Sequence, residues 1–275
     1  MTATLAPGPA SPATSRDDQL RVTQIRVVLS EWTKFRSLRS TLYTLLLAGV
    51  LMIGLGALLS AVAASQPHGF DAGATAVSTS LTGTFFAQLS VGVLGVLLIT
   101  GEYSTGMIRA SLAVVPARLP MLWAKLAVCA GAVFLTMLVS SLTAFMVGQA
   151  VLSGKHLNAT LSDPGALRSI VGAALYLTVA AMTALALGAL LRNTAAAIST
   201  FVAVFFVIPP LTMLLPASWS GHFVQYLPSN AGGMLIDGTY GVAHPLSPWT
   251  GFAVMCAYAV VLIGFAAWRL RRVDA

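Results

Sequence analysis

Charged residues are scarce in this chain. Only 8% of its 275 residues are Asp, Glu, Lys or Arg, whereas soluble domains have about 25%. Hydrophobic residues make up 57% of the chain and come in long blocks, so that the mean hydropathy reaches +0.86. A soluble fold cannot bury this much apolar surface. The composition therefore excludes an ordinary soluble domain and indicates a protein whose solvent is lipid.

Recognisable metal and redox motifs are also missing. The two cysteines, Cys129 and Cys256, lie far apart inside apolar blocks, and we interpret both as small core residues. The four histidines have neither HExxH nor Cys-His spacing, and we interpret them as ordinary polar residues at the protein surface in preference to metal ligands. They all fall in connections that we expect outside the membrane, namely His68, His156, His222 and His244.

The apolar blocks carry no ionisable residue near any predicted midplane. All eight carboxylates are expected in tails or connections, and the polar exceptions inside the blocks are Gln88 and Gln149. An ion-coupled carrier usually needs titratable groups at that depth, and an intramembrane hydrolase needs a base there. The pattern disfavours both classes, although backbone oxygens can also coordinate an ion, so the carrier is left as a weak alternative.

The chain has no ATP-binding motif of its own. GxxxxGK[ST] is absent, because Gly154 and Lys155 are followed by His156 and lack the earlier glycine. If this protein does active work, a partner must supply the energy.

Long apolar blocks predict an all-α polytopic membrane protein with six transmembrane helices. An even number of spans puts both termini on one side, and all but Lys155 and Arg168 of the 15 Lys and Arg residues fall on that side, which we assign to the cytoplasm. The expected spans are 42–64, 80–100, 121–152, 167–191, 195–215 and 249–268.

Two different segments precede the first span. Residues 1–19 are rich in Pro, Ala, Ser and Thr and predict a disordered cytoplasmic tail. Residues 20–40 predict an amphipathic helix at the membrane interface, and residues 41–275 form the six-span domain. An ordinary basic flank of the first span remains an alternative to the interface helix, and both descriptions can hold together.

The predicted interface helix mixes apolar and charged residues at helical spacing. We expect its apolar side to carry Ile25, Val28, Leu29, Trp32 and Phe35. Its other faces carry Arg26, Glu31, Lys34 and Arg36. Trp32, Lys34, Phe35 and Arg36 are the residues that we expect to hold it at the interface.

The connection between spans two and three, GEYSTGMIRASLAVVPARLP, is expected in the cytoplasm. Glu102 ends the second span with its charge in the interface, and Ser104 to Val115 can form a short coupling helix. On that helix Met107 can dock into a partner groove and Arg109 can pair with a carboxylate. A simple interfacial loop remains an equal alternative on physical grounds.

The external connection before the last span has no Lys or Arg and is rich in Gly, Pro and aromatic residues. We expect it either to dip back into the membrane or to cap the outer surface. Pro209 and Pro210 should kink the fifth span or end it early.

The run EYSTGMIRASLAVVPARLPMLWAKL closely resembles the second cytoplasmic connection of permease subunits in the type-2 family of ABC exporters, especially actinobacterial ones. SEWTKFRSLRSTLYTLL and YLPSNAGGML extend the resemblance over nearly the whole chain. In that family the connection is the coupling helix that contacts the ATPase subunit. The resemblance implies that coupling residues here are Glu102, Tyr103, Gly106, Met107 and Arg109.

The resemblance also implies partners and a location. It implies two permease chains, alike or different, with two separate ABC ATPase subunits that bind ATP and Mg, while this chain holds no cofactor and catalyses nothing itself. The chain would sit in the bacterial plasma (inner) membrane with both termini cytoplasmic, in contact with lipid and not with nucleic acid, and would export an amphipathic or hydrophobic substrate. The alternative is a non-transporting membrane assembly, resistance or sensory factor; an ion-coupled carrier is less favoured.

Overall fold

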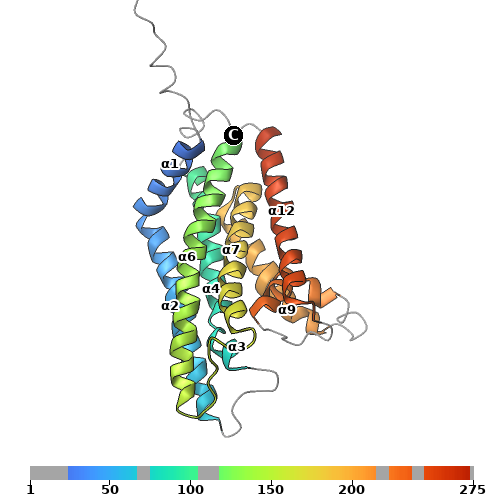
Figure 1. Cartoon of the computed structure of the whole chain (residues 1–275). Helices are drawn as coiled ribbons and strands as arrows, with labels where there is room; N and C mark the ends of the chain where they lie inside the picture. The colour runs from blue at the N-terminus through green and yellow to red at the C-terminus, as the bar shows by residue number, and fades with distance from the viewer. Residues whose placement is uncertain (1–23, 67–74, 105–117, 215–222, 237–244, 273–275) are drawn as a thin grey trace, which may run out of the picture.

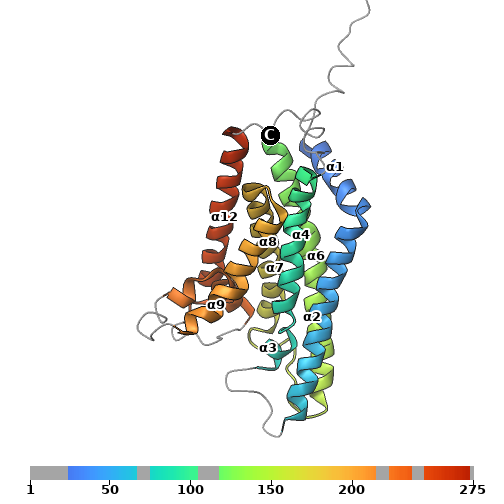
Figure 2. The same ribbon diagram turned by 180° about the vertical axis from the view of Figure 1, so that it is seen from behind.

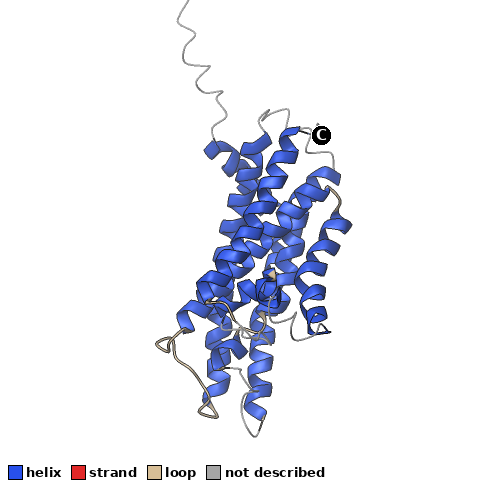
Figure 3. Cartoon of the chain, turned by 90° about the vertical axis from the view of Figure 1, so that its right-hand side faces the viewer, coloured by secondary structure: helices blue, strands red, loops and turns tan. Residues whose placement is uncertain are grey.

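The computed structural model describes residues 24–66, 75–104, 118–214, 223–236 and 245–272. Within these ranges the backbone is mostly helical and contains no strand (Figure 3). Six helices are long and apolar enough to cross a membrane, which confirms the predicted fold class. They are Arg39–Ser65, Thr84–Tyr103, Leu119–Ser153, Ala166–Leu191, Thr194–Leu211 and Pro248–Arg272.

The helices stand side by side in one bundle (Figure 1). Helix α1 (Gln24–Ser37) begins, and helix α12 (Pro248–Arg272) ends, at the same end of the bundle. Apart from Lys155 and Arg168, the described basic residues lie toward this end, which we call the basic end. The predicted tail, residues 1–19, lies outside the described residues, so the proposed domain boundaries stay predictions.

Helix α7 (Ala166–Leu191) is the centre of the bundle and the most buried of the six spans. It packs against α4 (Thr84–Ser104), α6 (Arg118–Ser153) and α12. Alanine and glycine recur along α7, and small side chains let neighbouring helix backbones approach closely where lipid provides no hydrophobic drive for helix association. The remaining long helix, α2 (Arg39–Ser65), packs on the outside against α4 and α6.

The fifth span is interrupted by its prolines. Helix α8 (Thr194–Val202) runs into a π-helical segment, η3 (Ala203–Val207), and then into α9 (Ile208–Leu211), which contains Pro209 and Pro210. Proline has no N–H to donate, and a local π turn is a common way of re-pairing backbone groups beside it. In Figure 2 this span crosses the back of the bundle, where α8 packs on α4 and α7.

The connection before the last span packs back against the bundle where it is described. A 3-10 turn, η5 (Val224–Tyr226), is followed by α11 (Pro228–Gly233) and by η6 (Met234–Ile236). Helix α11 contacts α12, and η6 contacts both α7 and α12, with Leu235 fully buried. This agrees with a segment that folds back onto the spans, and α12 then starts at Pro248.

The far end of the bundle is held by the glutamine at position 149. Gln149 Nε2 donates to the carbonyl of Ala76 and to Ser80 Oγ on the short helix α3 (Ala76–Ser80), and its Oε1 accepts from the backbone N–H of Ala159. The other predicted polar exception, Gln88, accepts a hydrogen bond from the hydroxyl of Tyr176. Gln149 is therefore paired at both ends of its amide, as polar groups in lipid require, whereas the buried Nε2 of Gln88 has no partner within the described residues.

Candidate functional site

Helix α1 buries one narrow face against the bundle. Val27, Glu31 and Phe35 are its buried residues, and their spacing of four puts them on one side of the helix. Ile25, Leu29 and Trp32 are exposed on the opposite side. Phe35 therefore lies on the buried side with Val28, which packs against the core, and apart from Ile25 and Leu29.

Glu31 corrects the sequence-based assignment of the helix faces. We expected it on a different face from Phe35, but it is 6% exposed and lies on the same buried face. The physical reason is a cation inside the bundle that the spacing of α1 alone cannot reveal.

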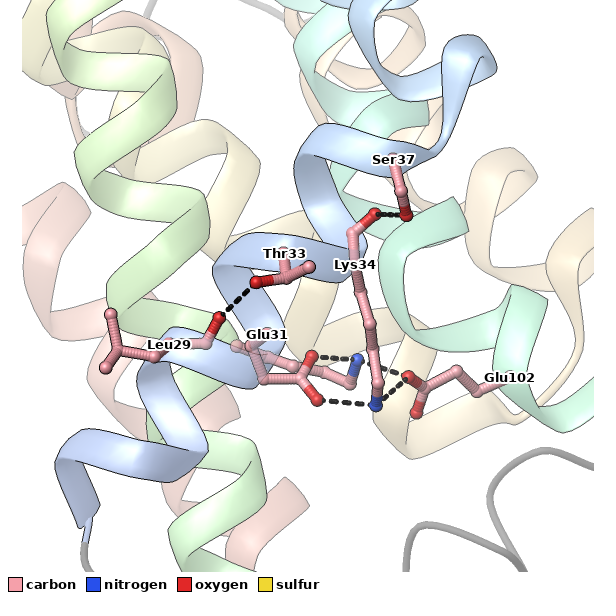
Figure 4. Close-up of polar contacts among 7 residues, drawn as sticks. Leu29, Glu31, Thr33, Lys34, Ser37 and Glu102 are labelled. Carbon is pink, nitrogen blue, oxygen red and sulfur yellow. Dashed lines mark hydrogen bonds and ion pairs between the residues drawn. The ribbon is translucent and has the colours of Figure 1, made fainter.

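Glu31, Lys34, Glu102 and Lys125 form a cluster of four charges, which we call the ion cluster. Lys125 Nζ donates to Glu31 Oε2 and to Glu102 Oε1, both at 2.6 Å. Lys34 Nζ donates to Glu31 Oε1 at 2.8 Å and to Glu102 Oε1 at 3.3 Å. Figure 4 shows Glu31 and Lys34 of α1 converging on Glu102 of α4. Positive and negative groups thus alternate, and three helices (α1, α4 and α6) are joined.

Three of the four charged side chains of the ion cluster are buried, which makes their mutual contacts important for stability. The side chains of Lys125 and Glu31 are 6% exposed and that of Glu102 is 10% exposed, whereas Lys34 is 31% exposed at the rim. A buried charge without a partner is very costly, and here each ammonium faces two carboxylates. Burial by itself would lower the pKa of Lys34, but the hydrogen bond and charge of Glu31 and the charge of Glu102 outweigh it and raise the pKa.

The structure adds burial to the predicted positions of two charges. Glu102 lies in the last turn of α4 and Lys125 lies near the start of α6, as the predicted spans imply, and both are buried near the basic end. The sequence does give one sign of a buried charge, because Lys125 is a lysine within the otherwise apolar run that begins at Met121. It does not identify the partners of Lys125, which come from other helices.

A cavity of about 330 Å³ adjoins the ion cluster. Its walls combine the four charged side chains with apolar ones from α1, α4 and α6. The lining residues are Glu31, Lys34, Phe35, Ser37, Leu38, Leu98, Gly101, Glu102, Lys125 and Val128.

Tyr103, the next predicted residue, joins α4 to the turn between α7 and α8. The guanidinium of Arg192 lies over its ring, 5.4 Å from the centroid. Arg192 ends α7 in a left-handed conformation with φ 52, and Asn193 then caps α8 by accepting from the N–H of Ala196. The last turn of α4 is thus tied to two neighbouring elements.

The remaining predicted residues divide into two groups. Trp32 is exposed and stacks on Phe35 with ring centroids 6.0 Å apart, and Arg36 is exposed, so both can face an interface. Gly106, Met107 and Arg109 of the predicted coupling helix lie outside the described residues. Among the residues that are described, three or more His, Cys, Asp or Glu side chains nowhere gather as metal ligands would.

A comparison with protein families gives one match. The model described as ABC-2 family transporter protein matches residues 27–210. The chain belongs to the ABC-2 transporter family. The matched range begins on the buried face of α1 and includes all four residues of the ion cluster. A search of curated proteins finds no match to this chain.

Membership in this family gives the chain a general role. This ABC-2 permease is a multi-pass membrane protein and a transport subunit. Membership in the family also implies an ABC transporter system with an ATPase partner. The ion cluster lies at the end of the permease where α4 ends and α6 begins.

Proposed function

We propose that this permease moves an amphipathic or hydrophobic substrate outward across a bacterial plasma membrane, using ATP and Mg bound by a separate ATPase subunit. The family match over residues 27–210 is the observation that carries the proposal. The basic end then faces the cytoplasm, in line with the bias of Lys and Arg toward that side. A second permease chain, alike or different, would complete the path.

The transmission of force is proposed to pass through the last turn of α4. Glu102 and Tyr103 are in that turn, and Gly106, Met107 and Arg109 follow in the connection expected to contact the ATPase. A push on this connection moves Glu102, and the 2.6 Å contact to Lys125 passes the movement to α6. Glu31 and Lys34 extend the linkage to α1. Charged hydrogen bonds in a buried site are stiff connectors because separating the partners is costly.

The partner is tested by purifying the permease in mild detergent from its native membrane. We expect a subunit bearing GxxxxGK[ST] to be recovered with it. Its repeated absence would contradict the proposal and favour a non-transporting membrane factor. Transport that persists without ATP and stops when the ion gradient is collapsed would favour an ion-coupled carrier.

The coupling residues are tested in the reconstituted complex. Glu102→Gln, which removes a charge from the cluster, and Arg109→Glu should each lower transport per ATP hydrolysed by about tenfold, the size of a typical coupling energy. Asp163→Asn is the matched control, since Asp163 is an exposed carboxylate in the loop between α6 and α7. Normal coupling in both test variants, with the complex intact, would exclude this segment as the coupling element.

A further inference from the structure

The two halves of the fifth span are held in different ways. Helix α8 is anchored in the bundle by Phe201, which is 1% exposed and fills the space left by the missing side chain of Gly92 on α4. A Cβ at Gly92 would collide with the ring of Phe201. Phe205 is equally buried and stacks on Phe201, with ring centroids 4.6 Å apart. Helix α8 is therefore fixed to α4.

The far half of the span has no such anchor. None of the four residues of α9 is buried, and Ile208 and Leu211 are 40% and 52% exposed. Within the described residues, α9 packs mainly on its own neighbours in the span, which are η3 and the 3-10 turn η4 (Thr212–Leu214). Leu214, at the end of this turn, is 82% exposed. Packing therefore holds α9 less firmly than α8.

The backbone hydrogen bonding is interrupted where the two halves meet. The N–H of Ile208 donates to the carbonyl of Ala203, five residues earlier, in place of the α-helical partner four residues earlier. Pro209 and Pro210 have no N–H, so they cannot donate to the carbonyls four residues before them. Sharp bends in helices occur at π-turns and at prolines, and here the two features adjoin. The span can therefore bend at η3 at little cost in backbone hydrogen bonds.

An aromatic contact joins η3 to α4. The ring of Phe206 meets that of Phe85 edge to face, with centroids 4.9 Å apart. Phe85 is 51% exposed, so the two rings can separate without opening a buried core. The free energy of an edge-to-face pair is modest, which suits a contact that forms and breaks.

We propose that η3 is a hinge about which α9 and η4 swing while α8 stays fixed on α4, and that Phe85 and Phe206 form its latch. With the two rings in contact, η3 keeps the conformation described above; with the rings apart, it bends where the hydrogen bonds are interrupted. The swing changes the apolar surface that the far end of the bundle presents to lipid. This proposal concerns a motion of the permease alone and does not rest on the proposed export function.

The hinge is tested by pulsed electron paramagnetic resonance on the intact permease, with Cys129 and Cys256 replaced by alanine. A spin label at Leu58→Cys on α2 is paired with one at Leu211→Cys on α9 or at Ser199→Cys on α8, all exposed positions. The pair with Leu211 should give two distances, and the pair with Ser199 should give one. Equal distributions would mean that the span moves as one body, and the hinge would be wrong.

The latch is tested with the Leu211 pair of labels. Phe206→Ala should raise the population of the second distance about two- to tenfold, the effect of one aromatic pair. Phe85→Ala should do the same, and the double variant should add nothing further. Phe265→Ala, the matched control, changes an exposed phenylalanine of α12 and should leave the population as it is. An unchanged population in Phe206→Ala would overturn the latch, and an unchanged Ser199 pair verifies that the variants are folded.

The backbone part of the hinge is tested by restoring the missing donors. Replacing Pro209 and Pro210 together by alanine returns two N–H groups, which can pair with the carbonyls of Phe205 and Phe206 in a continuous α-helix. The second distance should then fall at least about tenfold. Pro248→Ala is the matched control, because Pro248 begins α12, where the missing N–H has no helical partner in any case. A second distance that persists in the double alanine variant would exclude the hinge.

Discussion

Lys125 holds the two buried carboxylates of the ion cluster together. It is the cluster residue that contacts both of them at 2.6 Å and is itself 6% exposed. Lys34 contacts the same two carboxylates from the rim, with a longer distance to Glu102. The two lysines are therefore not equivalent, and their removal should have different consequences.

Lys125→Met should destabilise the protein by about 3–5 kcal/mol, the usual effect of removing one partner from a buried ion pair. The methionine fills a similar volume, so lost charge compensation between Glu31 and Glu102 dominates. The measurement is the free energy of unfolding in detergent. Lys155→Met is the matched control, because Lys155 is exposed near the opposite end, and it should change stability little. Equal losses in the two variants would show that the cluster is not stabilising.

Lys34→Met should cost less, about 1 kcal/mol, because the side chain is 31% exposed and water screens its contacts. The raised pKa of Lys34 fixes the pH dependence. A raised amine pKa gives stability that is fully present below the unfolded pKa and lost as pH rises through the folded one. The stability difference between wild type and Lys34→Met should therefore stay constant from about pH 6 to about pH 9 and shrink only at strongly alkaline pH. A change near neutral pH would contradict this.

At the scale of elements, the close contact between α4 and α7 depends on Gly95 of α4. A Cβ at Gly95 would meet the carbonyl oxygen of Ala181 on α7. This oxygen belongs to the helix backbone and cannot move aside easily. A Cβ at Gly54 of α2 would meet nothing within 4 Å. Sequence analysis alone cannot separate such glycines, since both lie in apolar spans with the same local pattern.

Gly95→Ala should therefore destabilise the bundle by about 1–3 kcal/mol, as overpacking does. Gly54→Ala, the matched control, should be neutral or stabilising by about 0.5–1 kcal/mol, because alanine favours helix more than glycine. Thermal unfolding in the same detergent gives both values. A neutral Gly95→Ala would mean that α4 and α7 are less closely packed than the structure indicates.

Helix α1 illustrates how far periodicity can predict an element. The helix itself was predictable from spacing, and the exposed side with Ile25, Leu29 and Trp32 agrees with an amphipathic helix at an interface. The inward side was not predictable, because Glu31 is buried only where Lys125 compensates its charge. A charged residue on a helix is normally assigned to an outward face, and that rule fails wherever a distant cation is its partner.

At the scale of the whole molecule, the orientation of the bundle in the membrane can be tested directly. Cysteines introduced at opposite ends report it in intact cells, after Cys129 and Cys256 are replaced by alanine. Lys155→Cys should react with a membrane-impermeant maleimide added outside, because Lys155 is exposed in the connection that we expect to be external. Arg36→Cys, exposed at the basic end, should react only after permeabilisation. The opposite pattern would reverse the orientation, and the proposed coupling site would then face the wrong side.

The chain by itself determined the number of spans and the gathering of basic residues at one end. The number of spans follows from lipid as solvent, because each span needs about 20 apolar residues whatever the neighbouring helices are. The gathering of basic residues follows from the bias of Lys and Arg toward one side of a membrane. Only the tertiary structure decided which charges meet. Glu31 and Lys125 are 94 residues apart, and Glu102 comes from a third helix. Burial of these charges is tolerable only when all three helices bring them within hydrogen-bonding distance, and no local pattern records that condition.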